Sequence, residues 1–365
     1  MTILHICTSS NYNVISSYIK FIYEEYYSKS NHTFIIMDKI CNVPDNIKQY
    51  DNVIIVDENS AKNIIYIIKE MKSHDRIILH SLNKTYFQFI LLLNKKLFKK
   101  LFWVSWGADL YQWKVMKNSI KYKIRNLIAY DVRMKIRNFV GIFPPDIDYF
   151  KKEFNSDAKT FYASYVGGLY NNLYKKQYKL RTLAEKTLNN EYINIQIGHS
   201  STSILNHIDV LENLVKYKNE NIKIYIPLSY GNKKYGDRVQ EVATQLFKDK
   251  VVCIREMMDK DDYMKFLSAI DIAIFNTTRQ IGLGNITPLL YMEKKIYIPK
   301  GTVMYDFYKD QEINICDYRD INKMNYDSFI EPVNMNNAKE YVILNSLNKE
   351  KKVEMWNNVF NAPLK

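Results

Sequence analysis

Residues 102–113, FWVSWGADLYQW, place a single carboxylate, Asp109, after an apolar run and among aromatic side chains. Burial of an unpaired charge is costly, so a carboxylate in this setting needs either a partner or a function. Because Trp106 and Tyr111 reduce its solvation, Asp109 is predicted to act as a general base. The alternative is that Asp109 caps the helix that follows.

His80 is the second group that could transfer protons, and it ends the apolar run 76–80. An imidazole changes its charge near neutral pH, so His80 is the other candidate for catalysis. The alternative is that His80 only orients the acceptor, the molecule that receives a transferred group. Gly107, next to Trp106, removes a side chain at the point where an acceptor molecule must pass.

Residues 279–285, RQIGLGN, follow an apolar run and open a helical segment. Gly282 and Gly284 allow backbone N–H groups to approach an anion, and the start of a helix adds a favourable dipole. Arg279 can pair with phosphate oxygens, so this segment predicts a diphosphate site, with a plain turn as the alternative. The dinucleotide fingerprint is absent, because residues 7–13, CTSSNYN, contain no glycine, and this argues against a dehydrogenase.

Residues 198–207, GHSSTSILNH, form a second loop that leads into a helical pattern. Its hydroxyl groups could bind phosphate, or Ser203 and Asn206 could simply cap the helix. Residues 227–231, PLSYG, could place Tyr230 against a base or a sugar ring, although a turn explains them equally well.

Two Asp-x-Asp sequences, at Asp146 and Asp148 and at Asp259 and Asp261, are of a kind that can hold a metal ion. Both precede helical segments, where Asp caps the helix and complements its dipole, so no metal and no cofactor are expected. The four cysteines lie far apart without a CxxC pair, which argues against a disulfide framework and a zinc site.

Short apolar runs alternate with helical patterns in both halves of the chain, as in a parallel sheet covered on both faces. Two such series predict two Rossmann-like domains, over residues 1–180 and 181–345, and a last helix within 346–365 that packs back on the first domain. The predicted strands lie at 3–7, 33–37, 52–56, 76–80, 102–106, 140–143, 193–197, 222–226, 251–254, 272–275 and 295–298.

Polar or special residues follow one predicted strand after another. In open α/β sheets, ligands bind beyond the carboxyl ends of the strands, so a site in a cleft between the two domains is predicted. The residues at these ends are His80, Trp106, Gly198, His199, Ser200, Pro227, Tyr230, Glu256 and Asn276.

The formal net charge is +13, and residues 91–137 contain twelve Lys or Arg but only Asp109 and Asp131 as acids. Within 91–102, LLLNKKLFKKLF, Leu and Phe residues between the lysines could insert into an anionic membrane surface. A solvated helix face and a nucleic-acid site are the alternatives, although no nucleic-acid motif accompanies the charge. Without a leader, and without an apolar run of about 18 residues, the chain is predicted to be cytoplasmic and peripheral on the inner face of the plasma membrane.

The chain resembles glycosyltransferase family 56, the 4-acetamido-4,6-dideoxygalactose transferases that elongate lipid-linked enterobacterial common antigen. The resemblance implies a GT-B fold, with two facing Rossmann-like domains around a cleft. It also implies a deoxythymidine-diphosphate sugar donor and an undecaprenyl-diphosphate-linked acceptor in bacterial surface polysaccharide synthesis. His80 and Glu256 fall at positions where the family has them. The resemblance covers most of the chain and rests on WGADLY at 106–111, the loop 198–207, PxxY at 227–230 and RQxGxG at 279–284.

The predicted function is therefore metal-independent transfer of a deoxy-amino sugar from a nucleoside diphosphate to a lipid-linked saccharide. An anionic membrane at residues 91–137 is a predicted partner, and nucleic acid is not. The open alternatives are a non-hydrolysing nucleotide-sugar epimerase and a non-catalytic protein that binds glycans or nucleic acid. The predicted residues are Asp109 and His80 for catalysis, Trp106, Gly107 and Tyr111 for the acceptor, and Gly198, His199, Ser200, Ser203, His207, Pro227, Tyr230, Glu256, Asn276, Arg279, Gln280, Gly282, Gly284 and Asn285 for the donor.

Overall fold

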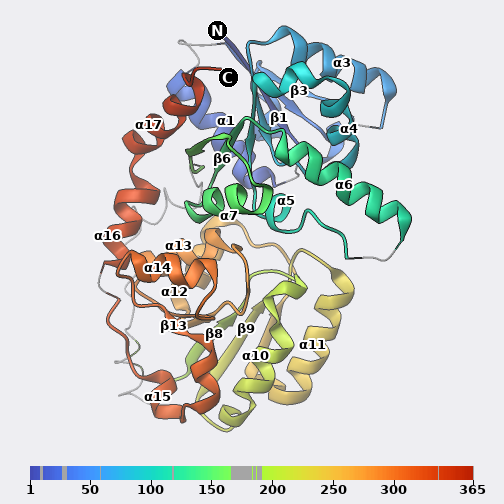
Figure 1. Cartoon of the computed structure of the whole chain (residues 1–365). Coiled ribbons are helices and arrows are strands. Elements are labelled where there is room, and N and C mark those ends of the chain that lie inside the picture. The colour runs from blue at the N-terminus through green and yellow to red at the C-terminus, as the bar shows by residue number, and fades with distance from the viewer. Residues whose placement is uncertain are drawn as a thin grey trace. The chain divides into compact units, whose positions relative to one another are not determined.

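The computed structural model divides into two compact units (Figure 1). Unit 1 comprises Met1–Gly168 with Asn348–Lys365, and unit 2 comprises Leu169–Leu347. The domain boundary expected at residues 180 and 181 lies outside the described residues. The structure describes residues 1–8, 11–26, 31–57, 59–116, 119–165, 183, 186, 191–335 and 337–364.

Unit 1 is built on a seven-stranded parallel sheet with the strand order β3-β2-β1-β4-β5-β6-β7. In this doubly wound order the chain reverses its direction of travel across the sheet between β1 and β4, which is where such folds bind ligands. The strands are β1 (Thr2–Cys7), β2 (Asn31–Ile36), β3 (Val53–Ile55), β4 (Arg76–His80), β5 (Leu101–Val104), β6 (Asn138–Gly141) and β7 (Lys159–Tyr162).

Helices cover both faces of this sheet. On one face Leu4 packs in a cluster with Phe87, and on the other Ile3 packs with Ile19 and Trp356. The alternation of side chains along each strand explains the two clusters, since neighbouring residues point to opposite faces. The helices are α1 (Tyr12–Tyr26), α2 (Asp45–Lys48), α3 (Ala61–Ser73), α4 (Thr85–Leu93), α5 (Ala108–Tyr111), α6 (Ile120–Met134), α7 (Pro145–Phe154) and α17 (Lys349–Phe360).

The last helix, α17, belongs to unit 1 although the whole of unit 2, Leu169–Leu347, precedes it along the chain. Its Trp356 is fully buried against the sheet. Arg76 of β4 donates hydrogen bonds to the backbone oxygens of Val359 at 3.1 Å and Ala362 at 2.6 Å. These contacts hold the end of the chain on unit 1.

The lysine-rich stretch 91–102 differs from its prediction. Leu97 and Phe98 are each 3% exposed, and Leu101 and Phe102 are fully buried in the core of unit 1. For these four side chains the predicted insertion into a membrane is therefore wrong, because the fold uses them to pack the sheet.

Unit 2 contains a six-stranded parallel sheet with the order β10-β9-β8-β11-β12-β13, which reverses between β8 and β11. The strands are β8 (Ile193–Ile197), β9 (Ile222–Pro227), β10 (Val251–Ile254), β11 (Ile272–Ile274), β12 (Lys295–Ile298) and β13 (Cys316–Asp317). The helices are α10 (His207–Leu214), α11 (Lys233–Phe247), α12 (Lys260–Ala269), α13 (Leu283–Tyr291), α14 (Val303–Asp310), α15 (Tyr326–Ile330) and α16 (Ala338–Val342).

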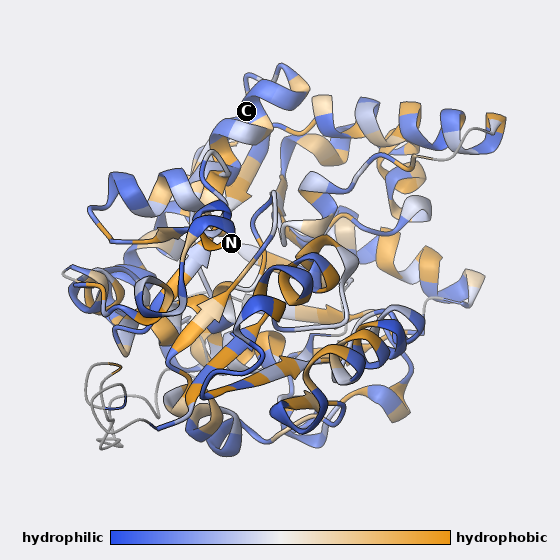
Figure 2. Cartoon of the chain, turned by 90° about the horizontal axis from the view of Figure 1, so that it is seen from below, coloured by the Kyte–Doolittle hydropathy of each residue, from blue (hydrophilic) through white to orange (hydrophobic). Residues whose placement is uncertain are grey.

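Each predicted strand overlaps a strand of the structure, and the strands are largely hydrophobic in Figure 2. The sequence analysis missed β7 and β13, the last strands at one edge of each sheet. Their sequences, KTFY and CD, lack the continuous apolar pattern that identified the other strands. Among the described residues, no helix has both the length and the apolar character that crossing a membrane requires.

Candidate active site

The carboxyl ends of β4 and β5 bring the predicted proton-transfer groups of unit 1 together. His80 ends β4, and Asp109 lies in the short helix α5 that follows β5. Ser81 has a φ of 74°, in the left-handed region that residues with a side chain seldom adopt. Gly107 has a φ of 79°, which glycine tolerates, and it turns the chain from β5 into α5.

Asp109 is a buried carboxylate, 1% exposed, whose two oxygens are held by N–H donors. Its Oδ2 accepts hydrogen bonds from the backbone N–H of Leu82 at 2.8 Å and from the indole N–H of Trp103 at 2.7 Å. Its Oδ1 accepts a hydrogen bond from the backbone N–H of Trp106 at 2.7 Å. One side chain thus ties the segments after β4 and β5 together.

This geometry bears on both predicted roles of Asp109. The N-cap residue of α5 is Gly107, and Asp109 lies in the first turn, where its Oδ1 accepts the backbone N–H of Trp106, so this contact resembles the reach-back of a capping box. A general base must reach the proton that it removes, whereas this carboxylate is enclosed and engaged by three donors. The contacts favour a structural role for Asp109 over the predicted catalytic one.

Arg133, which the sequence analysis did not single out, lies behind Asp109. Its Nη2 donates to the backbone oxygen of Asp109 at 2.8 Å, and its guanidinium stands 5.2 Å from the ring centre of Trp103. Burial lowers the pKa of Arg133 to about 10, while the charge of Asp109 acts to raise it. The two opposite charges offset each other beneath the site.

Three buried histidines form a row across the sheet of unit 1. Nδ1 of His5 lies 3.1 Å from Nε2 of His80, and Nε2 of His5 lies 2.8 Å from Nδ1 of His32. Burial lowers the pKa of His80 to about 3 and that of His32 to about 4, and it holds the pKa of His5 well below its usual range. All three imidazoles are therefore neutral at physiological pH.

His80 is also linked to Trp106. Nδ1 of His80 shares a hydrogen bond with the hydroxyl of Tyr165, and that hydroxyl accepts a 2.8 Å bond from the indole N–H of Trp106. Both ring nitrogens of His80 are thus engaged, which does not favour a base role. Both predicted catalytic residues are therefore linked to Trp106. Asp109 accepts the backbone N–H of Trp106, and His80 is linked to its indole through Tyr165.

Asp146 is a buried carboxyl group that the sequence analysis assigned to helix capping. It lies in the first turn of α7, after β6, and its Oδ1 accepts a 2.8 Å hydrogen bond from the hydroxyl of Tyr111. Burial raises the pKa of Asp146 to about 7, with the bond from Tyr111 acting against the shift and the charge of Asp109 adding to it. A carboxyl group that titrates near neutral pH suits acid–base chemistry. Burial is what raises this pKa, and no local sequence pattern reveals that Asp146 is buried.

A cavity of about 310 Å³ opens after β2 and β3 of the same sheet. Its lining is rich in carboxylate and amide groups. These are the groups that hydrogen-bond to hydroxyl-rich ligands. The lining residues are Asp38, Lys39, Cys41, Asn42, Asp57 and Asn59.

In unit 2 the loops after β8 and β9 lie side by side. The backbone N–H of Ser201 donates to the oxygen of Tyr230 at 2.7 Å, and that of Asn232 donates to the oxygen of Ser201 at 2.9 Å. Gly231, with a φ of 110°, is required here because a Cβ would stand 2.8 Å from the oxygen of Ser201. The ring of Tyr230 is 51% exposed and lies 6.2 Å from that of His199.

His199 and Gly282 bring the loop after β8 against the start of α13. Gly282 is the N-cap residue of α13 with a φ of 78°, and a Cβ on it would lie 3.0 Å from Nδ1 of His199. That nitrogen is buried without a hydrogen-bond partner among the described residues. Burial, followed by the charges of His207 and Arg279, lowers the pKa of His199 to about 3. A neutral imidazole therefore stands beside the N–H groups of a helix start.

The segment before α13 fixes the backbone around Arg279. The hydroxyl of Thr277 donates to the backbone oxygen of Arg279 at 3.2 Å, and Nη1 of Arg279 donates to the backbone oxygen of Gln280 at 2.8 Å. Arg279 and Gln280 are 8% and 5% exposed. Arg279 and Gln280 lie just before Gly282, the N-cap residue of α13, so this segment leads directly into that helix start.

The two remaining predicted residues of α13 have different surroundings. Oδ1 of Asn285 accepts hydrogen bonds from Nε2 of Gln196 at 3.1 Å and from the hydroxyl of Tyr263, so this amide joins β8, α12 and α13. Gly284 is exposed, and a Cβ on it would meet no atom within 4 Å. Its backbone is therefore accessible, while Asn285 is occupied by the fold.

The structure uses several other predicted donor residues internally. His207 approaches the hydroxyl of Tyr235 at 3.2 Å, and a Cβ on Gly198 would stand 2.5 Å from Nε2 of His207. Gly198 is therefore required by packing. Nδ2 of Asn276 donates to Oδ2 of Asp209 at 2.7 Å.

Neither predicted cap of α10 is present. Asn206 occupies the N-cap position without a side-chain cap bond, and its Nδ2 donates instead to the backbone oxygen of Asn276 at 3.1 Å. Ser203 begins a short 3-10 turn, also without a cap bond. The capping alternative for this loop therefore does not hold.

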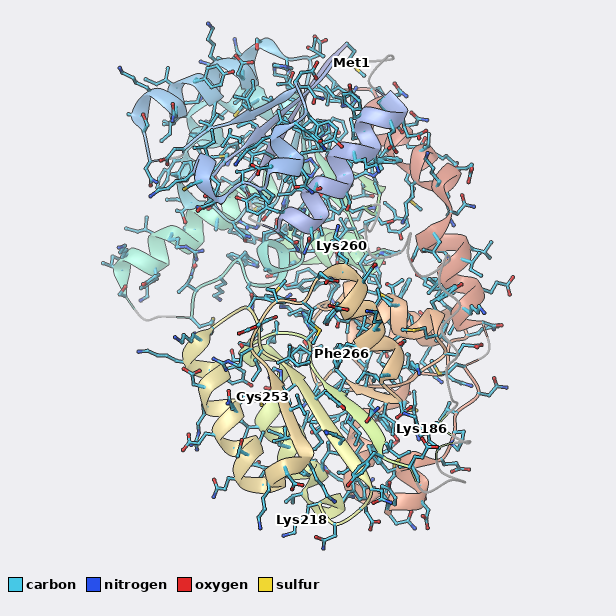
Figure 3. The ribbon with its side chains drawn as sticks, turned by 180° about the vertical axis from the view of Figure 1, so that it is seen from behind. Met1, Lys186, Lys218, Cys253, Lys260 and Phe266 are labelled. Atoms are coloured by element: carbon cyan, nitrogen blue, oxygen red, sulfur yellow. The ribbon has the colours of Figure 1, made fainter. Side chains whose placement is uncertain are left out.

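The remaining predicted donor residues lie in the loop after β8 and at the carboxyl ends of β9 and β10 in unit 2. The hydroxyls of Ser200 and Thr202 lie 2.9 Å apart, and Pro227 ends β9. Glu256 is exposed after β10, the strand on which Figure 3 labels Cys253. Among the described residues, no three His, Cys, Asp or Glu side chains are arranged to hold a metal ion.

Comparison with known proteins identifies one family and a shared fold. A family model described as 4-alpha-L-fucosyltransferase glycosyl transferase group 56 matches residues 1–327. The Anabaena protein HepE, solved with UDP and glucose, is 12% identical with a TM-score of 0.70, and all of each chain is covered. A glycosyltransferase from Rickettsia africae is 14% identical with a TM-score of 0.66, and 99% of each chain is covered.

A third similar structure is WaaG, a glycosyltransferase involved in lipopolysaccharide biosynthesis. It is 10% identical with a TM-score of 0.62, and all of each chain is covered. At these identities the similarity concerns the fold. It confirms the prediction of two parallel-sheet α/β domains of the GT-B class.

Proposed function

The chain belongs to the 4-alpha-L-fucosyltransferase family, glycosyltransferase group 56, and we propose that it moves a deoxy-amino sugar from deoxythymidine diphosphate to an undecaprenyl-diphosphate-linked saccharide. That it is a glycosyltransferase follows from the family and from its GT-B relatives, and this confirms the predicted family and enzyme class. The nucleotide, the lipid-linked acceptor and a role in bacterial surface polysaccharide synthesis form the proposal.

The observation that carries the donor site is the meeting of the start of α13 with the loop after β8. The first N–H groups of a helix have no partner within the helix and carry the positive end of its dipole. Gly282 and Gly284 keep side chains away from them. A diphosphate here would accept these N–H groups, and Arg279 would neutralise part of its charge.

The same groups serve the chemistry as well as binding. Negative charge grows on the departing nucleoside diphosphate, and preorganised donors stabilise that charge. We assign this role to Arg279, Gln280 and the start of α13, without a metal ion, and assign further phosphate contacts to Ser200 and Ser203. Tyr230 offers an exposed ring to the base or sugar, and the exposed carboxylate of Glu256 can accept hydrogen bonds from sugar hydroxyls.

We assign the acceptor to the carboxyl edge of unit 1, around Trp106, Gly107 and Tyr111. Trp106 is partly exposed and is held at its backbone and its indole, which suits it to contact a sugar ring. Asp146 replaces Asp109 as the proposed proton acceptor: it is fully buried too, but its pKa is raised to about 7 and it contacts the hydroxyl of Tyr111, which is partly exposed and can relay a proton to it. It would take the proton of the acceptor hydroxyl, through Tyr111, as the glycosidic bond forms.

Within the basic segment 91–137, we place the proposed membrane contact on α6. Ile120, Ile124 and Leu127 are 73%, 51% and 69% exposed and lie at positions i, i+4 and i+7, so they form one apolar stripe. The opposite side of α6 faces the core through Ala129 and Val132. A surface helix ordinarily carries polar residues where α6 carries this stripe.

The neighbourhood of the stripe matches an anionic lipid surface. Lys121 and Lys123 are exposed on the same helix, and α4, which packs against α6 (Figure 1), exposes Phe89 by 46% and Leu93 by 84%. Apolar side chains that enter the headgroup region, with lysines beside them, are typical of peripheral membrane proteins. We propose that this face holds the enzyme on the inner side of the plasma membrane, where a lipid-linked acceptor would be presented.

A nucleotide panel followed by turnover tests the function. We expect dTDP to raise the melting temperature more than UDP, GDP or ADP, because a ligand that binds the folded state stabilises it. With a dTDP-linked deoxy-amino sugar and an undecaprenyl-diphosphate-linked saccharide in vesicles, we expect release of dTDP and growth of the saccharide by one sugar. Conversion of the donor sugar without acceptor would indicate an epimerase, and the absence of any nucleotide response would indicate a non-catalytic binding protein.

A further inference from the structure

A continuous row of side chains runs from the carboxyl edge of unit 1 into its interior. It begins at Trp106 and passes through Tyr165 and His80 to His5 and His32, with each member hydrogen-bonded to the next. The three histidines lie on the adjacent strands β4, β1 and β2. Their rings are stacked, with the centre of His5 5.4 Å from that of His80 and 5.1 Å from that of His32.

Among the described residues, the row is surrounded by aromatic rings, and no other hydrogen-bond partner is found for its ring nitrogens. Phe34 stacks on His5 at 4.4 Å, and Tyr18 meets the rings of His5 and His80 edge-on at 5.6 and 5.1 Å. At the inner end, Nε2 of His32 is buried without a hydrogen-bond partner among the described residues. Each histidine therefore depends on its neighbours in the row.

Trp106 decides the direction of the hydrogen bonds. An indole N–H only donates, so the hydroxyl oxygen of Tyr165 accepts from Trp106, and its own hydrogen is available to Nδ1 of His80. His80 then carries its proton on Nε2 and donates to Nδ1 of His5, and His5 donates in the same way to His32. Within the row, and among the described residues, the Nε2–H of His32 is then the one group left unsatisfied.

The reverse direction is less favourable. If the histidines carried their protons on Nδ1, the hydroxyl hydrogen of Tyr165 would have no acceptor in the row, and the Nε2 lone pair of His32 would have no donor. Each unsatisfied buried polar group costs free energy, so the direction that leaves fewer of them prevails.

We propose that Tyr165, His80, His5 and His32 form one oriented hydrogen-bond row, with the proton on Nε2 of each histidine, which positions the indole of Trp106. The row explains why a neutral imidazole ends β4, where the sequence suggested a base. His80 and Tyr165 are positioning residues in this scheme, and Trp106 is the residue that meets the acceptor. That last role rests on the proposed function.

Nitrogen NMR of the full chain, labelled with 15N-histidine at pH 7, tests the row directly. The chain has six histidines, and single replacements of His74, His199 and His207 by Gln identify the signals outside the row. We expect His5, His32 and His80 to be protonated at Nε2 and bare at Nδ1. Protonation of His80 at Nδ1, or rapid exchange between the two forms, would overturn the proposed direction.

Tyr165→Phe then tests whether the row acts as a unit. Loss of the hydroxyl releases Nδ1 of His80, and we expect the nitrogen signals of His80, His5 and His32 all to shift. The matched control is Trp113→Phe, because that indole donates to Glu153 and lies outside the row. A shift confined to His80 would contradict a single row, and if Tyr165→Phe fails to fold, the wild-type spectrum still decides the direction.

Kinetics test the positioning of Trp106. In Tyr165→Phe we expect the acceptor KM to rise about five- to tenfold, the scale of one lost hydrogen bond, with donor KM and kcat unchanged. A loss in kcat alone would overturn the positioning role. A protein without transferase activity would refute the proposed function while leaving the NMR test of the row intact, so the two failures are distinguishable.

Discussion

The indole N–H of Trp103 donates a 2.7 Å hydrogen bond to Oδ2 of Asp109, and both side chains are buried. The aromatic residue that made this carboxylate conspicuous in the sequence is thus one of its partners. Trp106 supplies another through its backbone N–H. A buried polar group satisfied in this way needs no ligand to account for it.

Asp109→Asn is expected to destabilise unit 1 by about 2–3 kcal/mol, because an amide has one oxygen for three N–H donors and would turn its own N–H₂ toward them. Denaturant unfolding measures the loss. Asp131→Asn, which removes one side of an exposed ion pair with Lys135, is the matched control and should change stability by less than about 1 kcal/mol.

The same variant separates the two roles of Asp109. If it is a general base, Asp109→Asn keeps its stability while sugar transfer slows by on the order of 10²–10⁴-fold. That result would restore the role predicted from the sequence. Loss of stability, with Asp146→Asn instead slowing transfer in a stable protein, would support Asp146.

Arg279→Ala is expected to weaken nucleoside-diphosphate binding by about 1–3 kcal/mol, the cost of losing a hydrogen bond to a charged ligand. Titration calorimetry measures this change. Arg238→Ala removes an exposed arginine that pairs with Glu241 and serves as the control. Equal affinities for the wild type and Arg279→Ala would place the diphosphate elsewhere.

Gly282→Ala and Gly284→Ala form a matched pair at the start of α13. At Gly282 a Cβ meets His199 at 3.0 Å with a φ of 78°, so we expect alanine to cost about 1–3 kcal/mol of stability. At Gly284 the space is open, so alanine should preserve stability. Reduced nucleotide affinity in Gly284→Ala would show that a ligand approaches this backbone, and unchanged affinity would argue against it.

The buried histidines predict that stability falls as the pH drops below about 6.5. In the folded protein their pKa values are lowered to about 3 for His80 and His199 and to about 4 for His32 and His207. Between these values and about 6.5, the unfolded chain therefore binds more protons than the folded chain. Each can remove up to about 1.4 kcal/mol per pH unit over this range. Denaturant unfolding between pH 7 and 5 measures the slope, and a flat profile would contradict the neutral state of these groups.

Asp146 has the opposite effect to the histidines on how stability depends on pH. Its pKa is raised to about 7 when folded, so its contribution to stability is lost as the pH rises toward 7. Asp146→Asn keeps an oxygen for the hydroxyl of Tyr111 and is expected to steepen the loss of stability on acidification. An unchanged pH profile would mean that this carboxyl titrates normally.

Replacing Ile120, Ile124 and Leu127 by Ser is expected to abolish sedimentation with anionic vesicles while leaving the fold intact, because these side chains are exposed. Reversing Lys121 and Lys123 to Glu should also weaken binding, and wild-type binding should fall with salt. Unaltered sedimentation of the serine variant would exclude the α6 face. Loss of a dimer in that variant, seen by light scattering, would instead assign the stripe to a second copy of the chain.

The amino-acid sequence determined the fold class and supplied the candidate diphosphate loop, since both rest on local patterns of residues. A strand covered on both faces must be apolar throughout, and this pattern identified the central strands of both sheets. The segment 279–285 carries its glycines, its arginine and its helix start within a few residues. The edge strand β7, whose sequence KTFY is not an apolar run, escaped the same reasoning.

Tertiary structure alone decided which polar groups are reactive and which are satisfied. The donors to Asp109 include Leu82, 27 residues away in the chain, and His5 meets His80 across 75 residues. The raised pKa of Asp146 comes from burial among segments distant in the chain. Hydrogen bonding and desolvation depend on neighbours in space, so the spacing of residues along the chain could locate the edge of the sheet but could not assign the chemistry there.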